Sequence, residues 1–242
     1  METSLTGKVA IITGAGTGIG AATAEELGRR GMILVLVGRR EEVIGRVAER
    51  IRSAGVEAVA LAGDVRDYEA QASIVARAVE RFGHVDVFVA NAAIADFGPV
   101  DRADPRIWQD VITTNVLGVL YGMRAVLPTM YEHGSGHLVI VSSGSGRSTY
   151  VGEPAYIASK HATVAFADCL RMEVAPRGLR VTVIEPGLVE TPLIHVWEGS
   201  DDLVPGVTPL DPADCARAIA FALEQPPNCT VFEIALRPTN QI

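Results

Sequence analysis

Short apolar runs alternate with longer amphipathic stretches along the whole chain. Seven runs rich in β-branched residues predict strands, and 32–37 is apolar throughout, which is typical of a strand buried on both faces. Six stretches with apolar residues at helical spacing predict helices. The predicted strands are Val9–Thr13, Met32–Val37, Val56–Ala62, Val85–Ala90, His137–Ser142, Arg180–Glu185 and Thr230–Leu236, and the predicted helices are Gly18–Arg30, Glu41–Ala54, Asp67–Phe82, Pro105–Glu132 with an interruption at Pro128, Ala155–Ala175 and Pro212–Glu224.

Regular alternation of strand and helix implies parallel pairing through right-handed crossovers, with helices on both faces of the sheet. The pattern therefore predicts the α/β class, as one doubly wound Rossmann-type domain over residues 1–242 with a seven-stranded parallel sheet. The stretch Thr191–Leu210 has no clear periodicity. Because long irregular segments in small domains are usually binding loops, we expect a substrate lid at about 191–210.

Composition narrows the range of partners. Lys plus Arg number 21 and Asp plus Glu 29, a net charge of −8, which argues against a nucleic-acid or anionic-membrane partner. No apolar run reaches the roughly 18 residues of a membrane span, and the N-terminus has no signal-like region, so we expect a cytoplasmic protein. The three cysteines lack C-x-x-C spacing and the five histidines lack ligand spacing, so free thiols and no metal are expected.

A glycine-rich turn, Thr13–Gly20, lies between the first predicted strand and helix. Glycines there permit a tight turn and a close approach of the backbone to a pyrophosphate, which the helix N-terminus then attracts. The turn predicts a dinucleotide site. Two spacings fit equally well: G-x-G-x-x-A on Gly16, Gly18 and Ala21, and G-x-x-x-G-x-G on Gly14, Gly18 and Gly20.

The end of the second predicted strand bears on the choice of cofactor. An acid at this position would accept a hydrogen bond from the adenosine 2′-hydroxyl of NAD, but the sequence reads Gly38-Arg39-Arg40. Because a guanidinium pairs well with a phosphate, Arg39 and Arg40 favour NADP, with NAD still possible. The alternative is that the two arginines are solvated and are neutralised by Glu41 and Glu42.

Three further residues carry acid–base chemistry. Tyr156 and Lys160 are four residues apart on a predicted helix, so they share a face, and an ammonium near a phenol is expected to lower the phenol's pKa. Ser143 lies 13 residues before Tyr156 at the end of a strand, where doubly wound sheets bind ligands. Its hydroxyl could donate to a developing alkoxide.

Together these motifs resemble the short-chain dehydrogenase/reductase family in its compact single-domain branch, from about Leu5 to Asn240. The family's T-G-x-x-x-G-x-G matches Thr13–Gly20, which selects the second glycine spacing. The resemblance implies catalysis by Asn115, Ser143, Tyr156 and Lys160. The resemblance and the two arginines together imply cofactor binding by Gly14, Thr17, Gly18, Ile19, Gly20, Arg39, Arg40, Asp64, Val65, Asn91, Ala92, Tyr156, Lys160, Pro186, Gly187, Val189 and Thr191.

By this resemblance the protein exchanges hydride between nicotinamide and an alcohol/carbonyl pair. Tyr156 would transfer the proton, Ser143 would hold the substrate oxygen, Lys160 would bind the ribose, and Asn115 would anchor a relaying water. Asp64 would accept from the adenine amino group, and Val189 and Thr191 would meet the carboxamide. Ala93 departs from the family's glycine, and the C-terminus resembles the NADP-dependent serine and 3-hydroxy-acid dehydrogenases, a weak indication of substrate.

The substrate pocket is expected to be mostly apolar. Its expected residues are Ser143, Ile94, Phe97, Ser145, Leu188 and Trp197. Asn91 is interpreted as a support between sheet and cofactor, Ser142 as a packing neighbour of Ser143, and Arg147 as a solvated loop residue rather than an anion-binding one.

Excess apolar residues on the predicted helices Pro105–Glu132 and Ala155–Ala175 indicate a partner subunit, so a homodimer or homotetramer is expected. Two other functions remain to be weighed. A dinucleotide sensor without enzyme activity has the same fold, but Tyr156 and Lys160 are both present. A nucleotide-sugar epimerase needs a larger C-terminal domain than the roughly 50 residues that follow Pro186.

Overall fold

Residues 4–196 and 206–241 are described in a computed structural model of the chain. Within them, seven strands form one all-parallel sheet in the order β3-β2-β1-β4-β5-β6-β7. The strands are β1 Val9–Thr13, β2 Ile33–Gly38, β3 Ala58–Ala62, β4 Val87–Ala90, β5 Gly136–Val141, β6 Leu179–Pro186 and β7 Glu233–Leu236. This sheet confirms the predicted doubly wound α/β fold.

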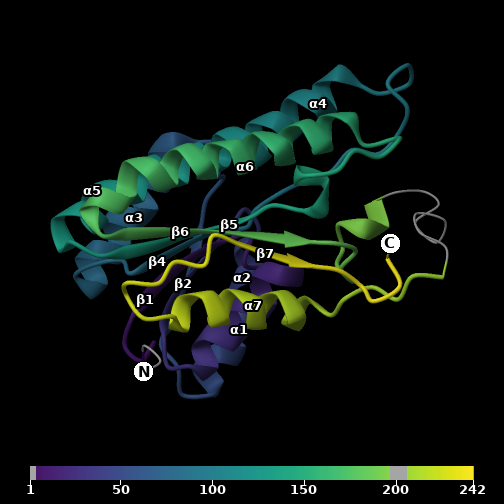
Figure 1. Cartoon of the computed structure of the whole chain (residues 1–242). Helices are drawn as coiled ribbons and strands as arrows, with labels where there is room; N and C mark the ends of the chain where they lie inside the picture. Colours follow the sequence, from purple (N-terminus) through teal and green to yellow (C-terminus); the bar gives the residue numbers. More distant parts are fainter. Residues whose placement is uncertain (1–3, 197–205, 242) are drawn as a thin grey trace.

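Helices cover both faces of the sheet (Figure 1). On one face lie α3, α5 and α6, with α4 leading into α5; on the other lie α1, α2 and α7. The helices are α1 Gly18–Arg29, α2 Glu41–Ser53, α3 Tyr68–Phe82, α4 Pro105–Ile112, α5 Gly118–His133, α6 Pro154–Val174 and α7 Pro212–Glu224.

Strand alternation builds two separate cores. Along β1, Ile11 contributes to the core under α3, α5 and α6, whereas its neighbour Ile12 contributes to the core under α1, α2 and α7. Successive side chains of a strand point to opposite faces, so a strand covered on both sides must be apolar at every position. This is why Met32–Val37 has no polar residue.

The apolar runs in the sequence predict which residues are buried more accurately than they predict which residues pair in the sheet. Val56 packs against the second core but precedes β3, because its N–H donates to the carbonyl of Ile51 at the end of α2. Asp86 likewise precedes β4, and its carboxylate accepts a hydrogen bond from the N–H of Val9 at 2.7 Å. The predicted strands therefore begin two residues too early at both places.

The predicted helix Pro105–Glu132 is continuous but differs from the expectation. Thr113–Leu117 between α4 and α5 is a π-helical segment, whereas Pro128 lies inside α5 without ending it. The predicted interruption at Pro128 is therefore wrong. Among the described residues, one helical stretch, Pro105–His133, has the length and the apolar composition needed to cross a membrane. However, 44% of its most apolar window is buried in the fold.

The strand order creates a crevice between β1 and β4. From β1 the chain proceeds to β2 on one side, and from β4 it proceeds to β5 on the other. The connections therefore diverge at the carboxyl ends of these two strands, which is where doubly wound sheets bind ligands. Most of the predicted cofactor motifs and Ser143 follow strand ends at this edge, whereas Asn115 lies between α4 and α5, and Tyr156 and Lys160 lie on α6.

Candidate active site

In the glycine turn, neighbouring atoms pack so closely against the glycines that a side chain would not fit. Gly14 and Gly18 have φ of +66° and +52°, a region that L-residues rarely adopt. A Cβ on Gly14 would lie 2.8 Å from the Cα of Ala92, and one on Gly20 would lie 2.3 Å from the carbonyl oxygen of Gly14. Gly16 has no positive φ. The geometry thus fits the spacing on Gly14, Gly18 and Gly20.

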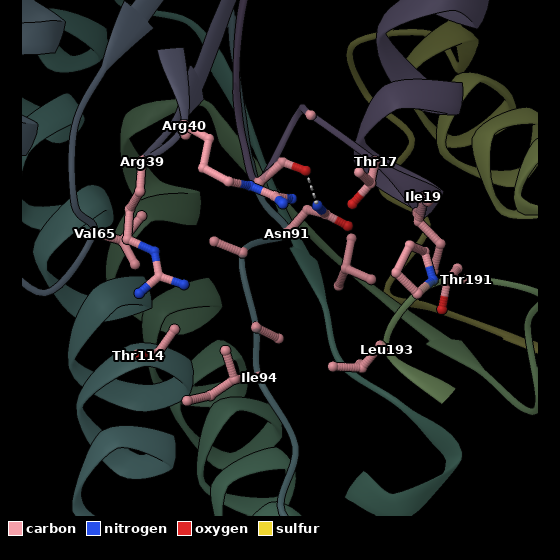
Figure 2. A pocket seen from close by; sticks show the side chains of 18 of the residues that line it. Thr17, Ile19, Arg39, Arg40, Val65, Asn91, Ile94, Thr114, Thr191 and Leu193 are labelled. Atoms are coloured by element: carbon pink, nitrogen blue, oxygen red, sulfur yellow. Dashed lines mark hydrogen bonds between the residues drawn. The ribbon is translucent and has the colours of Figure 1, made fainter. Parts of the chain in front are cut away.

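Thr13 and Asn91 fasten this turn to the sheet. The Thr13 hydroxyl accepts hydrogen bonds from the N–H groups of Asn91 and Ala92, at 3.0 and 3.2 Å. The Asn91 amide donates in return to the carbonyl of Thr13 at 2.9 Å and to that of Gly14 at 3.3 Å, and Figure 2 shows the second of these bonds beside the turn. Asn91 therefore bridges the ends of β1 and β4 and holds the turn open.

A cavity of about 260 Å³ lies in the crevice. Predicted residues lining it are Gly14, Thr17, Gly18, Ile19, Arg39, Arg40, Asp64, Val65, Asn91, Ala92, Ile94, Tyr156, Lys160 and Thr191. The cavity is also lined by residues that were not predicted because they carry no chemical signal, namely Val43, Ile44, Gly63, Thr114 and Val141, and by Pro192 and Leu193, which lie in the stretch predicted as a lid.

At one end of the cavity, charged side chains face the opening (Figure 2). Arg39 and Arg40 are exposed, and no ion pair joins either to Glu41, Glu42 or another described residue, contrary to the neutralised alternative. Asp64, in contrast, has an ion-pair partner: the guanidinium of Arg66 lies 2.6 Å from its carboxylate and holds the pKa of Asp64 below its usual range. The expected adenine acceptor is therefore already engaged by a neighbouring cation.

At the other end, Ser143, Tyr156 and Lys160 come together. A side-chain hydrogen bond joins Ser143 to Tyr156, and the ammonium of Lys160 lies 5.5 Å from the centre of the Tyr156 ring. Lys160 donates to the carbonyl of Val141 at 3.0 Å, so the last residue of β5 positions it. The phenyl ring of Phe97 lies 6.4 Å from that of Tyr156, although Phe97 is not among the residues that line the cavity.

The pKa values of this group correct one expectation. Burial raises the pKa of Tyr156 to about 12; the hydrogen bond with Ser143 opposes this, and the charge of Glu153 adds to it. Burial lowers the pKa of Lys160 to about 8. Desolvation disfavours each charged form and is the largest cause of both pKa shifts. The protein's own residues thus hold the phenol protonated, rather than lowering its pKa as the sequence suggested.

Asn115 is committed to neighbouring groups. It lies in the π-helical segment, is almost fully buried, and accepts from the N–H of Ile94 at 2.9 Å through its side-chain oxygen. Its amide donates to the carbonyl of Ile94 and to the hydroxyl of Ser159, at 2.8 and 3.0 Å. The side chain therefore clamps the segment after β4 to α6, and its donors are used in doing so.

Several predicted residues lie beside the cavity instead of along it. Gly20 packs behind the turn, and Ser145 is buried next to Ser143. After β6, Pro186 is buried at the strand end, Gly187 packs against Gln241, and Leu188 donates to the Gln241 side chain at 3.0 Å. Val189 was expected to meet the cofactor. It is buried instead, in a β-bridge with Leu210, and its side chain does not line the cavity. Trp197 lies outside the described residues.

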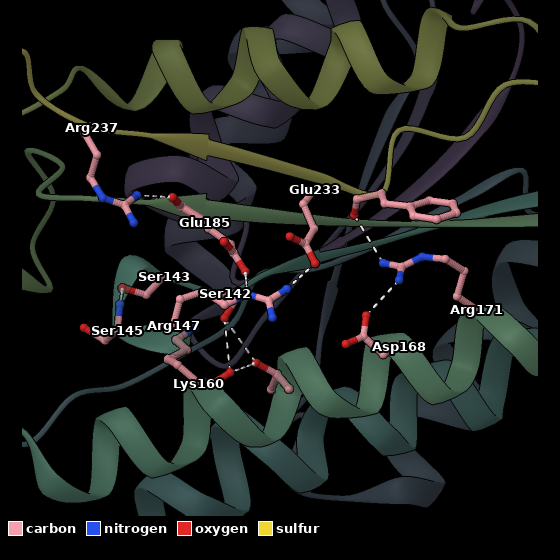
Figure 3. Close-up of polar contacts among 12 residues, drawn as sticks. Ser142, Ser143, Ser145, Arg147, Lys160, Asp168, Arg171, Glu185, Glu233 and Arg237 are labelled. Atoms are coloured by element: carbon pink, nitrogen blue, oxygen red, sulfur yellow. Dashed lines mark hydrogen bonds and ion pairs between the residues drawn. The ribbon is translucent and has the colours of Figure 1, made fainter. Parts of the chain in front are cut away.

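Arg147 is part of an ion-pair network below the serine turn (Figure 3). Its guanidinium donates to the buried carboxylate of Glu185 at 2.9 Å and also pairs with Glu233 on β7. Arg237 donates to the backbone carbonyl of Glu185 at 2.6 Å and packs against Gly144. Arg147 is exposed, as the sequence suggested, but its charge is not free for a substrate anion, because both carboxylates pair with it.

The fold also assembles histidines that linear spacing did not connect. His84, Asp86 and His133 bring their ligand atoms within 4.8 Å of one another at the amino end of β4, whereas Ser143 follows the carboxyl end of β5. The rings of His84 and His133 stack at 4.4 Å. Because Asp86 already accepts from Val9 and His84, we assign this cluster a structural role, tying α5 to the start of the sheet.

Comparison with known proteins agrees with this geometry. The family profile described as short chain dehydrogenase matches residues 8–200. An uncharacterized oxidoreductase of Staphylococcus saprophyticus is 38% identical, with 96% of this chain and 97% of that protein covered. The glycine betaine reductase of Emericella nidulans is 35% identical over 98% of this chain, which spans only 19% of that longer protein.

Among solved structures, a metagenomic short-chain oxidoreductase in complex with NADP is similar, at 30% identity and a TM-score of 0.85, covering 99% of this chain and 100% of that one. A parallel sheet flanked by helices, with a glycine turn and a Ser–Tyr–Lys group at its switch point, defines a dinucleotide-dependent oxidoreductase. The chain belongs to the short-chain dehydrogenase/reductase family.

Proposed function

We propose that the protein is an NADP(H)-dependent oxidoreductase that interconverts alcohols and carbonyl compounds. The observation that carries this proposal is the hydrogen bond between Ser143 and Tyr156, one helical turn from Lys160, at the end of a cavity that opens onto the glycine turn. A sensor would not need this group. Measuring NADPH consumption over a panel of ketones, hydroxy acids, sugars and steroids tests the proposal.

The cavity suits a phosphorylated dinucleotide. Gly14 and Gly18 form a cradle in which any Cβ would clash with Ala92 or Thr191, so the backbone N–H groups of the turn stay accessible to a pyrophosphate. Arg39 and Arg40 would hold a 2′-phosphate, because they line the same cavity and form no ion pair with a carboxylate among the described residues, although the charge of Arg39 helps to lower the pKa of Asp64. The NADP complex of the metagenomic relative supports this choice.

When bound, the nicotinamide supplies or accepts the hydride. In the reductive direction, Tyr156 gives its phenolic proton to the substrate oxygen, and Ser143 donates a hydrogen bond to the same oxygen as charge develops. The ammonium group of Lys160 lies 5.5 Å from the centre of the Tyr156 ring, close enough to stabilise the negative charge left on the phenolate. Asn115 acts by fixing Ile94 and the start of the catalytic helix, rather than by moving a proton through its side chain.

The direction of the reaction should depend on pH. Because burial raises the pKa of Tyr156 to about 12, the phenol is protonated at neutral pH and is ready to act as an acid. Alcohol oxidation needs the phenolate, so its kcat/KM should rise between pH 7 and 9, by at most about tenfold per pH unit. Initial rates in both directions measure this, and an oxidation rate that falls as the pH rises would contradict the assignment.

The assembly and domain organisation are also inferences. We infer a homodimer or homotetramer in which residues 1–242 form one domain with a lid near 191–210. Support comes from apolar side chains exposed on α4 and α6: Ile107 and Ile112 are 42% and 38% exposed, and Met172 is 72% exposed. Light scattering at micromolar concentration should give at least twice the 25.6 kDa chain mass, and a 26 kDa particle would refute it.

A further inference from the structure

Glu153 is a carboxylate beside the reacting group that the proposed mechanism does not use. It precedes α6, three residues before Tyr156, and its charge acts on the Tyr156 phenol. A residue at this position normally caps the helix with its side chain, but the Glu153 carboxylate makes no capping hydrogen bond. It accepts instead from the hydroxyl of Ser145 at 3.1 Å, so it points toward the serine turn.

Ser145 connects this carboxylate to the catalytic hydroxyl. Ser145 is buried, and its N–H donates to the side chain of Ser143 at 3.1 Å. The chain of contacts therefore runs from Glu153 through Ser145 and Ser143 to Tyr156. The N–H of Gly98 also donates to the carbonyl of Gly152 at 2.7 Å, so the segment containing Phe97 borders the same place. Glu153 is not among the residues that line the cavity, but this chain of contacts places it next to the catalytic end of the site.

Glu153 has unused capacity to accept hydrogen bonds. A carboxylate offers about four acceptor positions, and the described residues supply one donor, Ser145, and no ion-pair partner. The group is half-buried, and desolvation raises its pKa. A partly desolvated carboxylate gains from a further donor, and more from a cationic one. Because Ser145 is the one donor that the described residues supply to Glu153, a ligand could supply a second one.

The charge of Glu153 would repel an anionic ligand. The segments 93–101 and 148–159, which contain Phe97 and Glu153, have no Lys or Arg. Arg147 is neutralised by Glu185 and Glu233, Arg237 donates to backbone carbonyls, and Lys160 donates to Val141. A substrate carboxylate would therefore meet the charge of Glu153, which has no ion-pair partner among the described residues.

We propose that Glu153 is a specificity-determining residue, which accepts a hydrogen bond from a hydroxyl or ammonium substituent next to the reacting carbon of the substrate. The preferred substrates are then alcohols and carbonyls with such a donor, and carboxylates are disfavoured. This inference rests on the proposed function, and it opposes the weak indication of hydroxy acids from the C-terminal sequence.

Four secondary alcohols that share one carbinol and a methyl group test the inference: sec-butanol, propylene glycol, isopropanolamine and lactate. With NADP⁺, the wild-type protein should oxidise isopropanolamine and propylene glycol with kcat/KM at least about tenfold above lactate. Glu153→Gln should lower the ratio of kcat/KM for isopropanolamine over sec-butanol about tenfold or more and raise the ratio for lactate over sec-butanol, whereas a change in the Tyr156 pKa would act on all four alcohols alike. Ser145→Ala, which releases the carboxylate, should shift the ratios in the same direction by less.

Glu173→Gln is the matched control, because Glu173 is exposed on the same helix away from this end. It should change none of the ratios. A wild-type preference for lactate, or an equal loss on all four alcohols in Glu153→Gln, would overturn the inference while leaving the oxidoreductase function intact. If the wild-type protein oxidises none of the four and reduces none of the corresponding ketones, the proposed function itself fails, and this inference fails with it.

Discussion

Tyr156→Phe should lower kcat for carbonyl reduction by roughly 10²–10⁴-fold, the usual contribution of a positioned general acid. The substitution removes one oxygen and keeps the ring that Phe97 and Lys160 contact. The phenol is the only group hydrogen-bonded to Ser143 that can supply a proton at the cavity end among the described residues. Losing it leaves the substrate oxygen to be protonated by water.

Two measurements separate this role from a structural one. Binding of NADPH to Tyr156→Phe, followed by fluorescence titration, should stay within a few-fold of the wild-type Kd, because the cradle and the arginines are untouched. Tyr150→Phe is a matched control, since Tyr150 is half exposed in the preceding loop, and it should keep full activity. Retention of activity within tenfold in Tyr156→Phe would reject its role in proton transfer.

Arg39→Asp should reverse the cofactor preference. The ratio of kcat/KM for NADPH over NADH should fall by roughly 100-fold or more, because a charge-assisted hydrogen bond contributes about 1.5–3 kcal/mol and the new carboxylate adds repulsion toward a 2′-phosphate. The same carboxylate can accept from the 2′-hydroxyl of NADH. Steady-state rates with the two cofactors at a fixed substrate concentration measure the change.

Arg46→Asp controls for net charge in this experiment. Arg46 is exposed on α2, the helix that follows Arg39 and Arg40, but does not line the cavity. It should leave the ratio within about threefold. A wild-type enzyme that prefers NADH would contradict the interpretation of Arg39, and so would an Arg39→Asp variant that keeps its preference for NADPH.

Local rules predicted the cofactor half of the site well. Glycines at 14, 18 and 20 are needed because the backbone there has positive φ or no room for a Cβ, and such needs leave a direct trace in the sequence. The order of strands and helices followed from periodicity because each strand is buried on both faces. Family resemblance then connected Ser143, Tyr156 and Lys160, which the structure brings together.

What escaped prediction depends on contacts between distant residues. The π-helical segment at Thr113–Leu117 has no local signature, and its consequence is that the Asn115 side chain clamps Ile94. Arg147 looked like a loop residue because its partners, Glu185 and Glu233, are 38 and 86 residues away. The raised pKa of Tyr156 depends on burial, which only the packed structure shows. Glu153 was visible in the sequence, but its contact with Ser145 was not.

The most direct test of the account is a single-turnover experiment with purified protein, NADPH and a small hydroxyketone. The account predicts that NADPH absorbance falls in step with formation of the diol, one molecule for one, and that the Tyr156→Phe variant binds NADPH but slows this step by at least about 10²-fold. Binding of NADPH without its consumption, over the whole panel of carbonyl compounds, would contradict the account and indicate a dinucleotide-binding protein without this catalysis.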